Sequence, residues 1–239
     1  MADGNHRAQV RTTDKTDGDF AISLPPEMLA ARRRAVVDLP WAWLRQVHGA
    51  DVVEVTAQNI SEVCGREADA LVTRAPGVAL VIHTADCVPV TLVSSNGVLG
   101  VAHAGWRGLA AGVLDATVAS MVALGADLDD TQVFIGPGIG VECYEFSDDL
   151  IDQLTDRLVA PTGPGGPLRG VTSSGSNGLD MGRATLAALS KATESLAVVS
   201  VPFVRSLWCT ACDVDRYFSH RARAETGRMA TVAWIEPAR

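Results

Sequence analysis

The sequence predicts an α+β fold in a single domain, and three observations support that prediction. Short apolar runs typical of β-strands are mixed with several helical patterns, without the strict strand–helix alternation of a parallel α/β sheet. The chain has 239 residues, 47% of them hydrophobic, which is enough to bury a large core. No internal repeat or interdomain linker is evident. We therefore expect one domain over residues 1–239, with a flexible polar tail over residues 1–20.

Local patterns define the expected elements of the first half of the chain. Pro25 and Pro26 suit the start of a helix over Glu27–Val37. The basic run at residues 32–34 would lie on the solvated face of that helix. A loop is expected over Asn59–Arg66. Aromatic and branched residues predict the strands, which are Gly18–Ser23, Trp41–Val47, Val52–Thr56, Ala68–Thr73, Val78–His83 and Val98–Ala102.

The second half of the chain combines helices, strands and one long loop. A helix rich in small residues begins near Gly108, and another, over Met181–Ser195, follows Asp180 as its N-cap. Residues 162–178 are rich in Gly, Pro and Ser and have no secondary-structure period, which predicts a loop. The remaining expected elements are the helix Ser147–Ala160 and the strands Gln132–Ile135, Leu196–Leu207 and Arg228–Ile235.

Charge and cysteine usage restrict the function classes. Twenty basic against 28 acidic residues give a net charge of −8, which argues against a nucleic-acid or membrane partner but allows a local basic pocket. The first 20 residues lack the apolar segment of a signal peptide, and no apolar run reaches the length of a transmembrane helix. The five cysteines are an odd number and indicate reduced thiols. We expect a cytoplasmic monomer that acts on a small molecule.

Residues capable of chemistry follow two of the expected strands. Asp86 and Cys87 come shortly after the strand Val78–His83, and His103 comes directly after Val98–Ala102. A cysteine at the end of a strand is more often a small core residue than a reactive one. Here an imidazole is delivered by what we interpret as a neighbouring strand. Cys87 and His103 are therefore candidates for either metal ligands or a nucleophile and its base.

His48 is the third candidate, in a turn between two extended runs, with Gly49 leaving room for a ligand. A lone histidine in a turn is usually a surface residue, so its interest depends on the other two. If His48, Cys87 and His103 converge, they form a zinc-type site with one open position. If only Cys87 and His103 converge, they form a nucleophile–base dyad.

Several nearby side chains have two interpretations. Arg107 lies near the start of the helix after His103 and could bind an anion, or it could pair with Asp86 or Asp115. Arg45, close to His48, is a second candidate for holding phosphate. Asp86 could orient a metal-bound imidazole or merely cap a turn. His83, inside an apolar strand, is interpreted as a hydrogen-bonded core histidine.

The remaining cysteines give weaker signals. Cys209 and Cys212 form a CxxC motif, but no second CxxC completes a four-cysteine zinc site. We expect Cys64, Cys143, Cys209 and Cys212 to be unnecessary for metal binding. The Gly-rich run at residues 136–140 lacks the lysine and spacing of a phosphate-binding loop.

Nearly the whole chain, from about residue 40 to 236, resembles the YfiH (DUF152) family of laccase-domain proteins. The combination of QVHG, ADC and HAGWRG is specific, and the motifs stand in the family's order. The matching segments are RQVHGADV (45–52), ADALVT (68–73), HTADCVPV (83–90), AHAGWRG (102–108), IGPGIGVECYE (135–145), CTACDVDRYFSHRA (209–222) and GRMATVAWI (227–235).

The resemblance implies a fold, a metal and an activity. The fold is a four-layer α/β/β/α sandwich, similar to that of a cysteine-hydrolase toxin, and the metal is zinc, held by the residues that match the family motifs: His48, Cys87 and His103. The activity is phosphorolysis of adenosine, inosine, guanosine or methylthioadenosine, with adenosine deamination in addition. In this hypothesis Cys87, His103, Arg107 and Arg45 are the catalytic residues.

Three alternatives accompany this prediction. Copper and phenol oxidation are also attributed to the family, but multicopper electron transfer needs more histidines than the five present here. A metal-free Cys87–His103 hydrolase that edits cell-wall precursors is the second alternative. The third is a non-catalytic metal-binding module.

Overall fold

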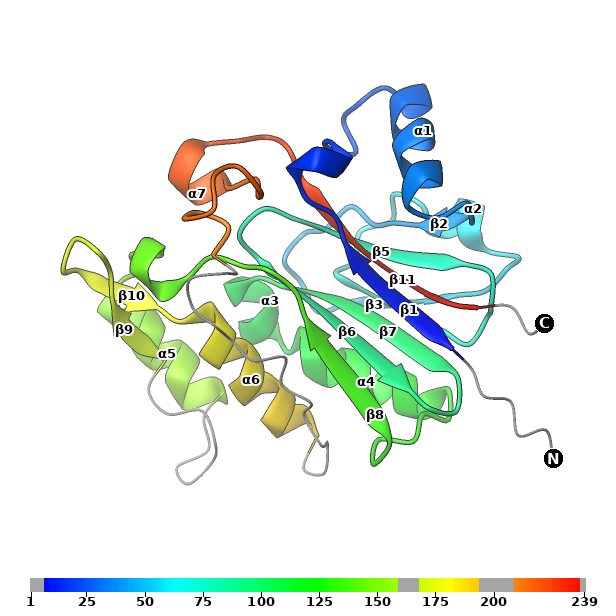
Figure 1. The fold of residues 1–239 in the computed structure, drawn as a ribbon. Helices are drawn as coiled ribbons and strands as arrows, with labels where there is room; N and C mark the ends of the chain where they lie inside the picture. The colour runs from blue at the N-terminus through cyan, green and yellow to red at the C-terminus, as the bar shows by residue number, and fades with distance from the viewer. Residues whose placement is uncertain (1–6, 159–167, 194–208, 237–239) are drawn as a thin grey trace.

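Two β-sheets pack face to face, and helices cover the outer face of each (Figure 1). The computed structural model describes residues 7–158, 168–193 and 209–236. The four layers are α1 (Pro26–Val36), a four-stranded sheet, a five-stranded sheet, and a second layer of helices over the five-stranded sheet. This arrangement confirms the predicted α+β class and the α/β/β/α sandwich.

The four-stranded sheet joins segments that are far apart in the sequence. Its order is β1-β11-β5-β2, antiparallel except for the β2–β5 pair. Helix α1 covers its outer face, where Phe20 stacks on Trp41 with ring centroids 5.9 Å apart and Arg33 lies 5.6 Å from the Trp41 ring. Arg33 is therefore packed inward and not solvated as expected. The strands are β1 (Ala8–Thr12), β11 (Met229–Ile235), β5 (Ala79–Thr84) and β2 (Trp41–Ala42).

The five-stranded sheet contains His103, one of the candidate site residues, on β7. Its order is β3-β4-β7-β6-β8, with only the β3–β4 pair parallel. Strands β6 and β7 form a long antiparallel hairpin at its centre. The strands are β3 (Val52–Val55), β4 (Ala70–Thr73), β7 (Val98–Ala104), β6 (Val88–Ser94) and β8 (Thr131–Ile135).

The alternation of side chains along each strand separates the layers. Leu80 and Ile82 of β5 pack between the sheets with Leu99 and Val101 of β7, and all four are fully buried. The intervening residues of β5 face the α1 side. Both faces of β5 and of β7 are thus covered, which explains why these strands are continuous apolar runs.

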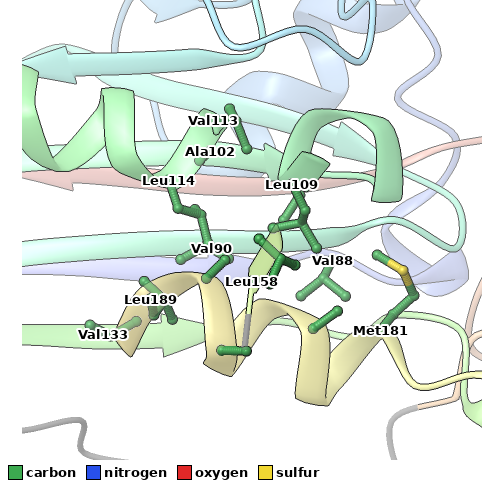
Figure 2. Packing of buried hydrophobic residues seen from close by; sticks show 14 of the residues in the cluster. Val88, Val90, Ala102, Leu109, Val113, Leu114, Val133, Leu158, Met181 and Leu189 are labelled. Carbon is green, nitrogen blue, oxygen red and sulfur yellow. The ribbon is translucent and has the colours of Figure 1, made fainter. Parts of the chain in front are cut away.

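The second helical layer packs on the outer face of the five-stranded sheet. Figure 2 shows Leu114 and Leu189 from the helices against Val90 and Val133 from the strands. Gly100 permits close approach of α4, because a Cβ there would lie 2.6 Å from Met121 Sδ. The helices are α3 (Trp106–Ala111), α4 (Val113–Ala123), α5 (Asp148–Leu158) and α6 (Met181–Ala192).

Short elements complete the described parts of the chain, and no helix in those parts has the length and apolarity needed to span a membrane. They are η1 (Lys15–Asp17), α2 (Ile60–Val63), η2 (Val141–Cys143), β9 (Arg169–Val171), β10 (Asn177–Leu179) and α7 (His220–Arg223).

The structure corrects several expectations in the first half of the chain. Residues 8–12, assigned to a flexible tail, form β1, because β11 supplies a full antiparallel partner. Residues 18–23 are not a strand, and the loop over 59–66 contains α2. The strand predicted over 41–47 ends at Ala42. Beyond it, the Gln46 side chain makes the hydrogen bonds that a neighbouring strand would make to β5. It donates to the His83 carbonyl and accepts from the His83 amide, both at 2.8 Å.

Other differences concern strands that the sequence pattern did not reveal. Strand β6 was not predicted, because Asp86, Cys87 and Pro89 read as a polar kink. The loop predicted over 162–178 includes β9 and most of β10. The helix after His103 begins at Trp106 and breaks at Gly112, whose φ is 90°. The predicted strand Leu196–Leu207 lies outside the described residues.

Candidate functional site

The three candidate metal ligands meet at one end of the sandwich. Donor atoms of His48, Cys87 and His103 all lie within 4.8 Å of one another. Cys87 Sγ is 3.8 Å from His48 Nε2, and the two imidazole rings cross edge to face with centroids 4.8 Å apart. Cys87 comes from the turn between β5 and β6, His103 from β7, and His48 from the loop after β2.

Strand pairing and two unusual backbone conformations create this convergence. Pro89 pairs with His103 across the β6–β7 ladder, which places Cys87 beside the end of β7. His48 and Asp86 have φ values of 61° and 92°, in the region that few residues other than glycine adopt. Gly105 lets the backbone approach the site closely, because a Cβ there would lie 2.7 Å from His48 Cδ2 and 3.1 Å from Cys87 Sγ.

Asp69 organises two of the three candidate ligands and was missed at the sequence level. Its Oδ1 lies 2.8 Å from His103 Nδ1, and the same oxygen accepts from the His48 amide at 2.9 Å. Its Oδ2 accepts from the amides of Val47 and Gly49 at 3.2 and 2.6 Å. The side chain is completely buried. An acidic residue inside the apolar run ADALVT was the available signal.

Asp86 does not orient an imidazole, contrary to one of our interpretations. Its Oδ1 accepts from the Thr210 hydroxyl at 2.7 Å, and its Oδ2 accepts from the Arg221 amide at 2.6 Å. Asp86 therefore ties the turn that carries Cys87 to the segments around Thr210 and Arg221. The imidazole-orienting role belongs to Asp69 instead.

The site strongly shifts two pKa values. Burial opposes ionisation of the Cys87 thiol, but His103 and His48 outweigh it and lower the Cys87 pKa to about 6. Burial also opposes protonation of His103, yet Cys87 and Asp69 raise the His103 pKa to about 9. Without a metal, the two groups thus form a thiolate–imidazolium pair at neutral pH. Such a thiolate is both a good nucleophile and a good soft-metal ligand.

A cavity of about 590 Å³ opens beside these residues. Among the described residues that line it, Asp86 is the only carboxylate, and its oxygens are already engaged. The lining also contains basic side chains from four separate segments, namely Arg45, Arg107, Arg221 and Arg228. In a chain with a net charge of −8, this is a local basic pocket.

The arginines differ in how free they are to bind a ligand. Arg107, in the first turn of α3, is exposed and stacks 4.4 Å from the Trp106 ring. It makes no ion pair within the described parts of the chain, so the alternative pairings with Asp86 or Asp115 are wrong. Arg45 forms an ion pair with Glu67 in which both side chains are more than half exposed. Arg221 and Arg228 donate to backbone carbonyls. Among the described residues of the cavity, Arg107 is therefore the arginine with neither an ion pair nor a carbonyl partner.

His83 also lines the cavity and differs from our interpretation. It is only 7% exposed, and neither ring nitrogen has a hydrogen-bond partner among the described residues. Burial, with smaller contributions from nearby positive charges, lowers the His83 pKa to about 3, so the ring is neutral. Tyr144 lines the same cavity, and burial raises its pKa to about 12. Both side chains line the cavity, but the two ring nitrogens of His83 are themselves buried from solvent.

The residues present fit a zinc ion. Two imidazoles and one thiolate match a three-ligand site with an open position, and Asp69 fixes His103 so that Nδ1 faces the carboxylate and Nε2 stays free for a metal. A second group of donors, Glu142, Cys143, Cys209 and Cys212, also converges within 4.8 Å. The partners that the CxxC lacked in the sequence therefore come from the segment at 142–143.

The fold and the site together define an α/β/β/α sandwich protein with a Cys–His centre. The family model described as multi-copper polyphenol oxidoreductase laccase matches residues 19–236, and the chain belongs to that family. This finding confirms the resemblance stated from the motifs.

Relatives and solved structures agree with that assignment. A purine nucleoside phosphorylase of Xylella fastidiosa is 41% identical over 196 residues, which cover 81% of this chain and 71% of the relative. A purine nucleoside phosphorylase of Mycobacterium tuberculosis is 34% identical over 225 residues, 92% of this chain and 84% of the relative.

Two crystal structures share the fold over nearly their whole length. YlmD from Geobacillus stearothermophilus matches with a TM-score of 0.77 at 28% identity, over 98% of this chain and 93% of that protein. YfiH from Bacillus licheniformis matches with a TM-score of 0.76 at 25% identity, over 96% and 93%.

Proposed function

We propose that this protein is a zinc-dependent purine nucleoside phosphorylase with adenosine deaminase activity at the same site. The substrates would be inorganic phosphate and adenosine, inosine, guanosine or methylthioadenosine. The observation that carries the proposal is the uncommitted Arg107 in a basic cavity beside His48, Cys87 and His103. The relatives named purine nucleoside phosphorylase support the same substrate class.

Arg107 is the residue best placed to bind phosphate. Its guanidinium borders the cavity, stacks on Trp106 and makes no ion pair with a described carboxylate. A planar guanidinium can donate two parallel hydrogen bonds to a phosphate and so hold it in a fixed orientation. Arg45 would assist only after exchanging its exposed ion pair with Glu67 for the phosphate.

His48, Cys87 and His103 would hold the zinc ion, with copper as a competing metal. When bound, zinc supplies Lewis-acid polarisation to the phosphate in phosphorolysis or to water in deamination. The protein's part is orientation: Asp69 holds the proton on His103 Nδ1, and the buried position of His103 fixes its ring.

His83 and Tyr144 are the best candidates for contacts to the nucleoside. Once a side-chain movement uncovers its buried nitrogens, the neutral His83 ring can donate from one nitrogen and accept at the other, which suits the mixed donor–acceptor edge of a purine. Tyr144 keeps its phenolic proton through neutral pH and can donate to ribose or base. A desolvated polar group gains most from such a partner, because leaving it unpaired is costly.

The experiment compares two reactions of adenosine: phosphorolysis, in which phosphate breaks the glycosidic bond, and deamination, in which water replaces the amino group of the base. Arg107→Ala should raise the phosphate KM of phosphorolysis about ten- to hundredfold, the value of a lost charge-assisted hydrogen bond of roughly 1.5–3 kcal/mol. Adenosine deamination uses water and should change much less. Arg34→Ala, an exposed arginine on α1, is the matched control. Equal loss of both activities would instead assign Arg107 to the nucleoside.

A Cys–His hydrolase is the second candidate, and one geometric observation favours it. Cys87, His103 and Asp69 stand in the order of nucleophile, base and orienting carboxylate. Removal of metal with a chelator separates the two proposals. Phosphorolysis should disappear without zinc and return when zinc is restored, whereas a thiol hydrolase would keep or gain activity without metal.

A further inference from the structure

Three cysteines and a glutamate form a second cluster outside the catalytic cavity. Glu142 and Cys143 belong to the η2 segment, and Cys209 and Cys212 are the two ends of the CxxC loop. The Cys143 and Cys212 sulfurs are 3.3 Å apart, and Cys212 Sγ lies 3.7 Å from Glu142 Oε1. None of the four lines the cavity described above.

The backbone around the cluster is arranged to hold these donors. The Gly140 amide donates to Cys209 Sγ at 3.1 Å, a hydrogen bond that stabilises a sulfur carrying negative charge. A Cβ at Gly140 would overlap the Glu142 carboxylate, so glycine is what lets that side chain fold back over the cluster. Cys209 is fixed by a bridge to Gly138, and the Thr210 amide donates to the Gly138 carbonyl at 3.0 Å.

The geometry matches a closed tetrahedral metal site. With metal–sulfur bonds of about 2.3 Å, tetrahedral sulfurs lie about 3.8 Å apart. The four donors here lie within 4.8 Å of one another, so a shift of less than about 1 Å per side chain would complete the coordination. Cys209 is buried, while Cys212 is exposed and leaves an entry route for an ion.

We propose that Glu142, Cys143, Cys209 and Cys212 bind a second divalent metal ion of the zinc type, as a structural site. Three thiolates and one carboxylate fill all four positions, which leaves none for a substrate. The thiols lose their protons to solvent on binding, and no electron is transferred. This proposal is independent of the metal at His48, Cys87 and His103.

The position of the cluster indicates what the ion would stabilise. Thr210, next to Cys209, donates through its hydroxyl to Asp86, the neighbour of Cys87. Arg223 donates to the carbonyls of Thr210 and Ala211 at 3.2 and 2.8 Å. The residue after Cys143 is Tyr144, which lines the cavity. An ion in the cluster would therefore hold together the segments that form one wall of the cavity.

The closeness of two sulfurs also raises the alternative of a Cys143–Cys212 disulfide. A disulfide would need an oxidant, and it would give no role to Glu142 or to the amide that donates to Cys209. A metal uses all four donors. Metal binding is therefore the better account of the arrangement.

Cobalt(II) titration of the full-length Cys87→Ala protein, reduced and stripped of metal, tests the proposal. Removal of Cys87 leaves the first site without a thiolate, so a sulfur-to-cobalt charge-transfer band reports on the cysteine cluster alone. We expect one equivalent of cobalt with tetrahedral visible bands. Adding Cys212→Ser should lower the charge-transfer intensity by about one third, because one of three thiolates is lost, and weaken cobalt binding. Cys212 is exposed, so this variant should fold.

Cys64→Ser in the same background is the matched control, because Cys64 donates to the Trp41 carbonyl and lies outside the cluster. It should leave the band unchanged. Zinc should also raise the melting temperature of Cys87→Ala protein but not of its Cys212→Ser derivative. The proposal is overturned if Cys87→Ala protein shows no charge-transfer band, or if Cys212→Ser leaves it intact. It is equally overturned if thiol counting of unreduced, metal-free protein finds the Cys143–Cys212 disulfide and zinc does not bind after reduction.

Discussion

Asp69→Asn should destabilise the protein and weaken metal binding together, although Asp69 itself is not a proposed ligand. Each carboxylate oxygen serves two groups: His103 and the His48 amide at one, and the Val47 and Gly49 amides at the other. Asparagine keeps one acceptor oxygen and turns an NH2 group toward two donors. Breaking a fully buried charged pair in this way costs about 3–5 kcal/mol.

The loss is measurable as both stability and affinity. For a chain of this size, a destabilisation of about 3 kcal/mol lowers the melting temperature by about 6–12 °C. Loss of a carboxylate behind a metal-binding histidine lowers metal affinity about 10- to 100-fold. Calorimetry of metal-free protein and competition with a zinc-binding dye would provide the two values. Asp156→Asn, the same chemical change at an exposed position of α5, is the control.

The stabilisation by Asp69 should depend on pH in a defined direction. Burial opposes ionisation of Asp69, but the hydrogen bonds from His103 and the backbone amides lower its pKa. A lowered carboxyl pKa contributes stability above the unfolded value of about 3.9, and that contribution is lost as the pH falls through the folded value. The difference in free energy of unfolding between the wild type and Asp69→Asn should therefore decrease as the pH falls. A variant as stable as Asp156→Asn, with unchanged zinc affinity, would refute the role assigned to Asp69.

Three further predictions test the site and the core. In metal-free protein, the rate of Cys87 alkylation by iodoacetamide, followed by mass spectrometry, should increase with a midpoint at pH about 6. In His103→Gln the midpoint of this increase should move above pH about 8.5, because burial then dominates the pKa of the thiol. His83→Leu should not lower the melting temperature, because it removes unpaired buried nitrogens. It should raise the nucleoside KM about five- to hundredfold, and an unchanged KM would exclude His83 from the substrate site. Leu99→Ala, between the sheets, should cost about 2–5 kcal/mol in denaturant unfolding with zinc content unchanged, and a loss of zinc would show that core and site are coupled.

Residues that follow strands were easy to find from the sequence. His103 comes directly after a pure apolar run, and Cys87 lies a few positions beyond another, which made both residues candidates. The expectation that these two runs are neighbouring strands was wrong, because they are β5 and β7 of different sheets. Cys87 meets His103 because β6, which begins directly after Cys87, pairs with β7. His48 was a third candidate only on condition that it converges with the other two, and the family motifs then implied that it is a metal ligand. Strand β1 was not predictable, because its alternating exposed and half-buried residues become a strand only when β11 lies beside it.

Long-range partners set the limit of what the sequence could predict. Asp69 acquires its role because the β4–β7 register puts its carbonyl 2.8 Å from the His103 amide and its carboxylate beside the ring. The CxxC seemed incomplete because Cys143 lies 66 positions before Cys209 in the printed sequence. In both cases the chemistry arises from residues that only the folded chain brings together.

The hydrogen bond from Thr210 to Asp86 joins the site of His48, Cys87 and His103 to the cysteine cluster over a very short path. Thr210 is covalently attached to Cys209, and Asp86 to Cys87, so one hydroxyl–carboxylate contact of 2.7 Å connects them. Any coupling between the two sites must be reciprocal. If a metal ion in one site changes the metal affinity of the other site by some factor, an ion in the other site changes the affinity of the first by the same factor. If this contact couples the two sites, Thr210→Val, which keeps the shape and removes the hydroxyl, should reduce the factor by which metal in one site changes the metal affinity of the other.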